Sequence, residues 1–380
     1  MKTLHLLVAL VSAALAGLPG WAQNQTFQSG STGADRILAP TGPTTIILPP
    51  DGRLNYTTVH IPPNVTVTFT RNAANTPVYL LATGGIHIEG NIHVDGEDGQ
   101  ALRGGRSGPG GFDGGMPGIL GNPPGDGLGP GGGRGDTSSG LAGRGIYGAN
   151  FPSGSGRLLD GTIYGSQLLV PLVGGSGGGG ALNQGGGGGG GAILIASDTA
   201  ITNGPNSLVR AWGGSPNGSG GAIRLVAPII VGTGSVDVGG WNTVNAGRIR
   251  CDLIERQLFG LRFSPHSAAV TAGEAFLVTF PPNGPSLRLV SVAGEPVPPN
   301  APAGFTVQLP FGAPAIQPIV LEATDFGVDV PVAIRLTPAV GSAAPPIPVT
   351  INNVAPRSAQ TTVNATFPPN VPVFVEAWTR

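Results

Sequence analysis

Charge is scarce in this 380-residue chain, and lysine is almost absent. Charged residues make up 10% of the sequence, against about 25% in an average soluble protein. The net charge of −1 argues against a nucleic-acid-binding protein, which needs a basic stripe. Lys2 is the only lysine, so Schiff-base chemistry and a lysine-containing phosphate loop are excluded for the chain beyond it.

Cysteine is equally rare, because Cys251 is the only one. A single cysteine excludes an internal disulfide framework. In the segment Arg248-Ile-Arg-Cys251, alternation places Ile249 and Cys251 on the same face of a strand. This pattern predicts a small buried apolar side chain, and the alternative is a reactive or intermolecular thiol.

Long apolar runs occur only at the start of the chain. Lys2 precedes the apolar segment from Leu4 to Leu15, and Gly20-Trp-Ala22 supplies small residues before Gln23. This order is typical of a signal peptide over residues 1–22 that is cleaved after Ala22. We therefore expect a secreted, extracellular or periplasmic protein. No later segment is apolar for the roughly 18 residues that a spanning helix requires, so we expect no membrane anchor.

Glycine and proline are abundant instead, with 67 and 38 residues. Inside a helix, glycine costs about 1 kcal/mol and proline about 3 kcal/mol relative to alanine. The composition therefore excludes a mainly helical protein and favours strands and turns.

The middle of the chain contains a repeat of 19 to 23 residues. Residues 78–96, 192–214 and 222–240 each give three short apolar strands separated by corners and ending in glycine. Within the first repeat, Ile86, Ile88, Ile92 and Val94 alternate with polar residues, which is the pattern of half-buried strands. Repeats of this length bury their apolar residues by stacking. They predict a right-handed parallel β-helix, which begins with strands at 45–48, 54–61 and 65–70. Its inward positions should include Ile86, Ile88, Ile92, Val94, Ile193, Ile195, Ile223 and Leu225.

A glycine-rich tract at residues 99–191 interrupts this repeat, and 38 of its 93 residues are glycine. We expect an excursion from one corner of the β-helix, with Gly185–Gly191 lying flat against the helix surface because glycine has no Cβ. The sequence leaves open whether residues 100–180 are ordered.

The pattern changes again at about residue 261, where glycine runs stop and proline-rich turns begin. Eight short alternating strands in this part predict an immunoglobulin-like β-sandwich. They are expected at 276–280, 287–292, 305–309, 319–323, 330–336, 348–351, 361–367 and 373–378. The expected domains are thus a β-helix over 23–260 and a β-sandwich over 261–380.

Two stretches of the N-terminal third resemble a known group of proteins. They are Gly30-Ser-Thr-Gly-Ala-Asp35 and the strand and turn segments from Leu48 to Ala82. Together they resemble uncharacterised secreted bacterial glycine-rich β-helix proteins that open on the motif GSTGAD. The likeness covers about residues 30–98, with a looser one at 192–250. It implies export and the β-helix fold and no catalytic residues. More distantly, the fold is similar to that of pectin lyases.

One short segment concentrates carboxylates that could bind a metal ion. Asp95, Glu97 and Asp98 lie in Val94-Asp-Gly-Glu-Asp-Gly99, and carboxylates flanked by glycine suit Ca²⁺, which binds oxygen ligands. The alternative is a plain solvated turn. A second candidate metal set consists of two pairs, His87 with Glu89 and His93 with Asp95. The turn at residues 90–91 places these two pairs on different faces of the β-helix. We expect no other cofactor.

Two functions are compatible with these patterns. The first is a structural or interaction protein that acts at the cell surface or in the extracellular matrix, by adhesion or assembly and with self-association as an option. The alternative is a carbohydrate-active β-helix enzyme, a polysaccharide lyase or glycoside hydrolase, or a polysaccharide-binding protein. Carbohydrate sites display exposed aromatic side chains, and a lyase or hydrolase needs carboxylates and an arginine in one groove.

Overall fold

The computed structural model describes residues 27–119, 121–137, 142–148, 159–240, 245–255, 260–265, 268–276, 278, 285–299, 304–355 and 357–379. The predicted signal peptide and its cleavage site lie outside these residues. In the described part of the chain, all regular elements are strands. None of the described residues forms a helix long and apolar enough to cross a membrane.

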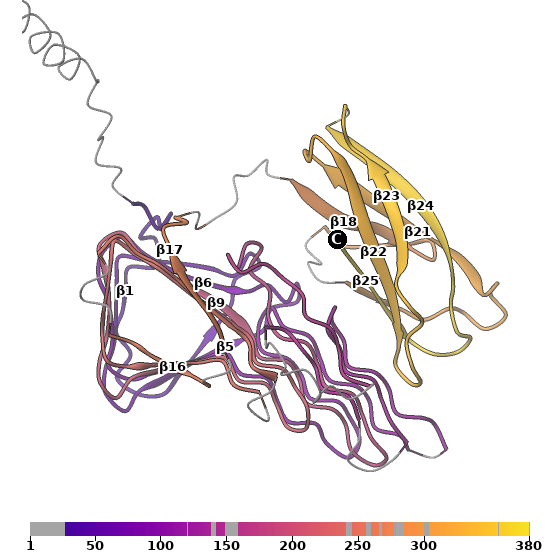
Figure 1. Ribbon diagram of the computed structural model, residues 1–380, viewed down its shortest axis with the longest axis horizontal. Coiled ribbons are helices and arrows are strands. Elements are labelled where there is room, and N and C mark those ends of the chain that lie inside the picture. The colour runs from indigo at the N-terminus through magenta and orange to yellow at the C-terminus, as the bar shows by residue number, and fades with distance from the viewer. Residues whose placement is uncertain are drawn as a thin grey trace, which may run out of the picture.

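Three parallel sheets form the first part of the molecule (Figure 1). Each successive turn of the chain adds one strand to every sheet, except that the last turn adds strands only to sheets B and C. This is the topology expected of stacked coils. Sheet A contains β1 (Ile37–Leu38), β4 (Thr58–Ile61), β7 (Ile86–Ile88), β10 (Ala200–Asn203) and β13 (Ile229–Gly232). Sheet B contains β2 (Thr44–Ile47), β5 (Thr66–Thr70), β8 (Asn91–His93), β11 (Leu208–Arg210), β14 (Ser235–Asp237) and β16 (Arg262–Ser264). Sheet C contains β3 (Arg53–Tyr56), β6 (Val78–Ala82), β9 (Ala192–Ser197), β12 (Ala222–Val226), β15 (Arg248–Asp252) and β17 (Ala269–Gly273).

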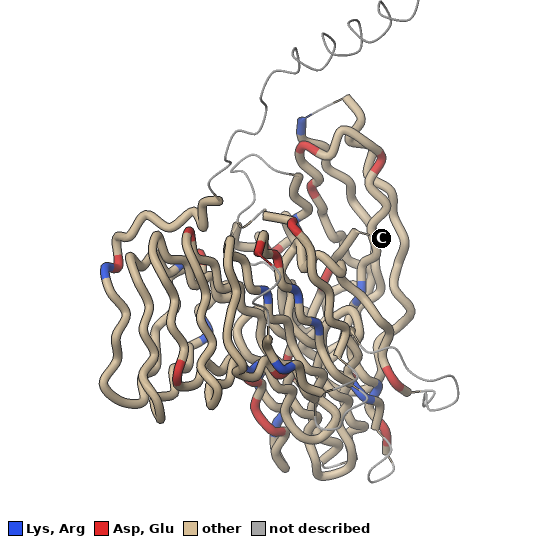
Figure 2. Tube along the Cα trace, turned by 60° about the vertical axis from the view of Figure 1, so that its left-hand side comes forward, with Lys and Arg blue, Asp and Glu red and all other residues tan. Residues whose placement is uncertain are grey.

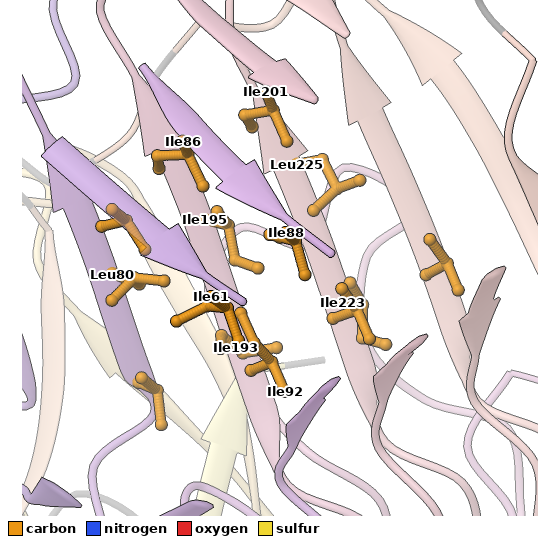
Figure 3. Close-up of a cluster of buried hydrophobic side chains, with 14 of the residues drawn as sticks. Ile61, Leu80, Ile86, Ile88, Ile92, Ile193, Ile195, Ile201, Ile223 and Leu225 are labelled. Carbon is orange, nitrogen blue, oxygen red and sulfur yellow. The ribbon is translucent and has the colours of Figure 1, made fainter. Parts of the chain in front are cut away.

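The register of these sheets confirms the repeat. Ile92 pairs with Val209, and Val209 pairs with Val236, so equivalent positions of the three repeats stack on one another. All eight positions predicted to point inward are at most 2% exposed, and Figure 3 shows most of them in the core between the sheets. These positions are Ile86, Ile88, Ile92, Val94, Ile193, Ile195, Ile223 and Leu225. Parallel sheets with this topology are consistent with the predicted β-helix.

Cys251 lies in the same core and is fully buried. It stacks on Leu225 of the preceding coil, and burial raises the pKa of its thiol to about 12. The prediction of a small buried apolar side chain is confirmed. The segment 54–61, predicted as one strand, is instead two, because the chain bends at Thr57 to pass from sheet C to sheet A.

In its described residues, the glycine-rich tract is an ordered bundle of extended segments, and Gly185–Gly191 does not lie flat on the coils as predicted. The connections from sheet B to sheet C that follow β8, β11 and β14 take part in it, through the described residues of 94–191, 211–221 and 238–247. Figure 1 shows these segments leaving one corner of the coils side by side. We call this unit the glycine bundle. The order left open for residues 100–180 is thus present in their described part.

Gly185–Gly191 lies at the centre of this bundle and donates hydrogen bonds with a period of three. Every third amide bonds to the same neighbouring segment. The first set of amides, from Gly185, Gly188 and Gly191, donates to the carbonyls of Gln100, Glu97 and Val94. The second set, from Gly186, Gly189 and Ala192, donates to Gly115, Phe112 and Pro109. The third set, from Gly187 and Gly190, donates to Pro216 and Ser219. A left-handed extended helix of three residues per turn, with no internal hydrogen bonds, sends its amides outward in three directions about 120° apart. The central segment therefore has this polyproline II form.

The carbonyls of the same segment accept bonds from further segments. The carbonyls of Gly186 and Gly189 accept from the amides of Gly105 and Gly108, and those of Gly187 and Gly190 accept from Gly178 and Gly175. The carbonyl of Gly188 accepts from the amide of Gly214. The segment is thus surrounded on all sides by backbone. A Cβ on Gly189 would lie 1.9 Å from the carbonyl oxygen of Gly175, so glycine is required there.

Two four-stranded antiparallel sheets form the C-terminal part. Sheet D contains β19 (Glu295–Pro296), β18 (Ser286–Val292), β21 (Ile316–Thr324) and β24 (Ser358–Thr366). Sheet E contains β20 (Phe305–Val307), β25 (Val373–Thr379), β22 (Asp329–Pro338) and β23 (Ile347–Asn352). Residues of both sheets share one apolar core, among them Leu321 and Ile334. Seven of the eight predicted strands are present.

The predicted boundary at residue 261 is wrong by about one coil. β16 pairs with β14 and β17 pairs with β15, so the parallel sheets continue to Gly273. Leu261 and Phe263 pack in the coil core, although their surroundings lack the glycine runs that marked the earlier coils. The predicted strand at 276–280 lies partly outside the described residues. Phe276 and Val278 pack on the outer face of sheet C instead.

The C-terminal sheets contact the glycine bundle through buried polar groups. The carboxylate of Asp126 accepts hydrogen bonds from the amides of Gly135 and Ala343, both at 2.8 Å. The guanidinium of Arg335 on sheet E donates to the carbonyl of Gly129 at 3.2 Å. Asp126 is 2% exposed, so this contact joins the two parts away from water.

Candidate functional site

The most distinctive polar cluster lies where sheet B meets the glycine bundle. β8 ends at His93 and β11 ends at Arg210, and these two residues are direct neighbours across the sheet. Because side chains alternate along a strand, the inward positions of Ile92 and Val209 send His93 and Arg210 outward. Figure 2 shows that charged residues are few and scattered along the chain.

Arg210 organises the cluster. Its guanidinium donates to one carboxylate oxygen of Asp95 at 2.6 and 2.9 Å, and it lies 4.6 Å from the ring centroid of Trp212. The other oxygen of Asp95 accepts the backbone amide of Trp212 at 2.8 Å. Trp212 is 42% exposed. The ion pair therefore fixes a large aromatic ring at the surface, above a cation.

His93 completes this cluster as a neutral imidazole. Burial and the positive charge of Arg210 lower the pKa of His93 below its usual value, although Asp95 acts in the opposite sense. Its Nδ1 lies 3.3 Å from Arg210, so the proton is placed on Nε2. This Nε2 is buried and has no hydrogen-bond partner among the described residues. The imidazole thus carries an N–H at neutral pH that is shielded from solvent.

This geometry suits binding better than proton transfer. Asp95 is held by Arg210 and by a backbone amide. Asp237, the neighbour of Arg210 on the next coil, accepts the amide of Gly239 at 2.8 Å. Both carboxylates therefore have structural partners. An exposed indole face with adjacent polar groups is a surface on which a flat, hydroxylated ring can stack.

The three carboxylates of the predicted calcium site face three different partners. Asp95 binds Arg210, the Glu97 carboxylate lies 3.0 Å from the Arg103 guanidinium, and Asp98 accepts the amide of Ser215 at 2.7 Å. Among the residues described, no three or more His, Cys, Asp or Glu side chains gather as a metal ion would require. The calcium site stays a prediction from sequence.

The second candidate metal set is divided between two sheets. On sheet A, Glu89 lies 2.8 Å from His60 of the preceding coil, and His87 stacks directly on His60. On sheet B, His93 and Asp95 belong to the cluster around Arg210. The separation of the two pairs follows from the turn at residues 90–91.

A buried ionic network on sheet C was not anticipated from the sequence. Asp252 is fully buried and lies 2.9 Å from Arg224 and 2.6 Å from Arg250. Arg224 stacks on Arg250 because β12 and β15 are in register. Aligning the sequences of these two strands would have predicted that both arginines lie on the same face of sheet C. The backbone of Ala275 bonds to this network, since its amide donates to Asp252 and its carbonyl accepts from Arg224. The network is shielded from solvent and serves packing.

A shallow cavity of about 360 Å³ lies on the glycine bundle. Its lining residues include Asn122, Thr137, Leu182 and Asn183. Leu182 is 44% exposed. This combination of amides, one hydroxyl and apolar surface offers contacts for a neutral polar ligand.

Comparison with known protein families, with curated proteins and with solved structures found no match.

Proposed function

We propose that this is a secreted structural or interaction protein that acts at the cell surface or in the extracellular matrix, by adhesion or assembly. The observation that carries the proposal is the glycine bundle. Its many backbone hydrogen bonds hold extended segments side by side. A rigid scaffold that presents connecting segments is a common way to build a binding surface.

The finer features of the fold belong to the same proposal. Parallel coils that bury an apolar core are compatible with a right-handed β-helix. Two antiparallel sheets around one core are compatible with an immunoglobulin-like β-sandwich. The GSTGAD segment and the expected cleavage after Ala22 support export and membership of a group of secreted bacterial β-helix proteins.

Adhesion can be tested at the cavity on the bundle. Leu182→Asp replaces an exposed leucine of this cavity with a charge, and we expect it to abolish attachment of protein-coated beads to cells or matrix. The matched control is Ile47→Asp on the first coil, where the side chain is 81% exposed, and this variant should attach normally. Equal attachment by all three proteins would contradict the role of the bundle surface.

The alternative function is polysaccharide binding, and the Arg210–Trp212 cluster favours it. An exposed indole ring above a fixed guanidinium is an arrangement that suits stacking of a sugar. A glycan array and a polysaccharide-depolymerisation screen would test this function. We expect Trp212→Ala to remove any glycan signal and Phe311→Ala, which truncates an aromatic residue 93% exposed elsewhere, to retain it. A signal unaffected by Trp212→Ala would place the sugar site elsewhere.

A further inference from the structure

The outer strands of the two C-terminal sheets differ in how well they are protected from pairing. Free strand edges are templates for association, and proteins blunt them with short length, proline, charge or bulges. β19 and β20 are two and three residues long, and β23 contains Pro348. β24 has nine residues, Ser358–Thr366, with no proline, no charge and no register shift against β21.

β24 has one open edge. In the part of the chain that the structure describes, it pairs only with β21. Figure 1 shows it on the side of the C-terminal sheets that faces away from the coils. Strand addition to such an edge needs only backbone groups and a compatible side-chain pattern.

The hydrogen bonds at the ends of β24 show which backbone groups are open. The amide of Phe367 donates to Ala315, and the carbonyl of Arg357 accepts from Asp325, so the odd-numbered residues bond toward β21. Backbone groups alternate in direction along an antiparallel strand. The amides and carbonyls of Ser358, Gln360, Thr362, Asn364 and Thr366 therefore point to the open edge.

The sequence of β24 is nearly palindromic in chemical character about Thr362. It reads Ser-Ala-Gln-Thr-Thr-Val-Asn-Ala-Thr. Antiparallel pairing of two copies about Thr362 would place these residues opposite each other: Ser358 and Thr366, Ala359 and Ala365, Gln360 and Asn364, Thr361 and Val363, and Thr362 and itself. Hydroxyl thus meets hydroxyl, amide meets amide, and the isosteric threonine and valine meet. No like charges face each other anywhere along the strand.

This register also matches the open backbone groups. Each even-numbered residue meets an even-numbered residue of the other copy, so every open amide lies opposite an open carbonyl. The side-chain faces agree as well, because residues directly opposite in an antiparallel pair lie on the same face of the sheet. The more exposed even-numbered residues would then continue the outer face of sheet D.

We propose that β24 is a self-association surface, at which a second copy of this chain adds antiparallel about Thr362. Two copies of sheet D then form one continuous eight-stranded sheet around a two-fold axis. Such an interface is isologous and closed, because each surface contacts its own equivalent. It uses neither the Arg210–Trp212 cluster nor the cavity on the bundle, so it stands independently of the proposed adhesion.

Charge substitution at the two-fold axis tests this surface. Thr362→Lys and Thr362→Glu each place like charges opposite each other, and each should convert the full-length mature protein to monomers in sedimentation velocity. An equimolar mixture of the two variants should restore the dimer, because lysine then faces glutamate. The matched control is Thr350→Lys on the edge strand β23 of sheet E, which should leave the dimer intact.

Amide hydrogen exchange gives a second readout that does not depend on variants. On raising the protein concentration, the even-numbered amides from Ser358 to Thr366 should gain protection, while the odd-numbered amides should be protected at every concentration. A wild-type protein that stays monomeric at its solubility limit would overturn the proposal. A dimer that survives Thr362→Lys without change would also overturn it. Thermal unfolding of each variant checks that sheet D remains folded.

Discussion

The coils and the glycine bundle are adjacent parts of one chain that satisfy the backbone in different ways. In the coils, strands pair in sheets and apolar side chains fill the interior. In the bundle, extended segments bond to neighbours in several directions, and the space between them is filled by backbone. Buried backbone groups must be paired in either case. The bundle shows that this can be done without an apolar side-chain core.

This difference predicts different sensitivities to substitution. The coils tolerate changes on their outer faces and depend on apolar volume inside. The bundle depends on the absence of side chains, because a Cβ on most of its central glycines would lie within 3 Å of another backbone atom. The same small change should therefore be harmless in one region and damaging in the other.

The largest expected effect is Ile193→Asp, which places a charge in the coil core. Ile193 is fully buried and pairs with Val78 and Ile223 on neighbouring strands. An unpaired buried charge should lower the free energy of unfolding by more than about 3 kcal/mol. Chemical denaturation would measure this loss. Ile47→Asp, at an exposed position, should change stability by less than about 0.5 kcal/mol, and equal effects would mean that the inward face is misassigned.

The next effect is Gly189→Ala, which adds one methyl group at the centre of the bundle. The new Cβ would lie 1.9 Å from the carbonyl oxygen of Gly175, so segments must separate and their hydrogen bonds lengthen. We expect a loss of about 2–3 kcal/mol, as for overpacked cores. Gly42→Ala is the control, because a Cβ there has nothing within 4 Å. If both variants unfold at the same denaturant concentration, the close packing of the bundle is contradicted.

The smallest expected effect is a pH dependence where sheet E covers the bundle. Both carboxylate oxygens of Glu376 are buried, and they have no hydrogen-bond partner among the described residues. Glu376 lies opposite Arg335 across sheet E and interacts electrostatically with Tyr164, whose hydroxyl donates to the carbonyl of Gly174. Burial raises the pKa of Glu376 from 4.5 to about 7, although the positive charge of Arg335 opposes the rise.

A raised carboxyl pKa means that the native state binds the proton more tightly than the unfolded state. The contribution of Glu376 is therefore most favourable below about pH 4.5 and is lost as the pH rises to about 7. The loss is at most about 3 kcal/mol, and water entry on ionisation should reduce it to about 1–2 kcal/mol. Stability of wild type relative to Glu376→Gln should fall by this amount between pH 5 and pH 8. A difference that stays constant with pH would show that Glu376 is ionised throughout.

The coils were predictable because side chains carry the signal. The alternation of Ile86, Ile88, Ile92 and Val94 with polar residues sets both the strands and the inward face. The boundary at 261 was not predictable, because the last coil around Leu261 lacks the glycine turns of the earlier ones. Its place in the fold depends on pairing with distant strands.

The bundle and most of the candidate site could not be predicted from local sequence. Glycine has no side chain to alternate, so the period of three appears only when the partners of Gly185–Gly191 are known. Asp95 was identified as a ligand candidate, but its partner Arg210 is 115 residues away. Nothing in the local sequence distinguishes Trp212 from the other three tryptophans. Their meeting depends on the register between β8 and β11.

Residue-resolved amide hydrogen exchange of the full-length protein tests the central claim, that the glycine-rich tract is a hydrogen-bonded bundle. The amides of Gly185–Gly191 each donate to another segment, and we predict that they exchange as slowly as those of Ile193 and Ile195 in the coil core. Protection in this run should be lost together with that of the coils as denaturant is added. Exchange of these glycine amides at the rate of an unstructured chain, while the coils remain protected, would contradict the account.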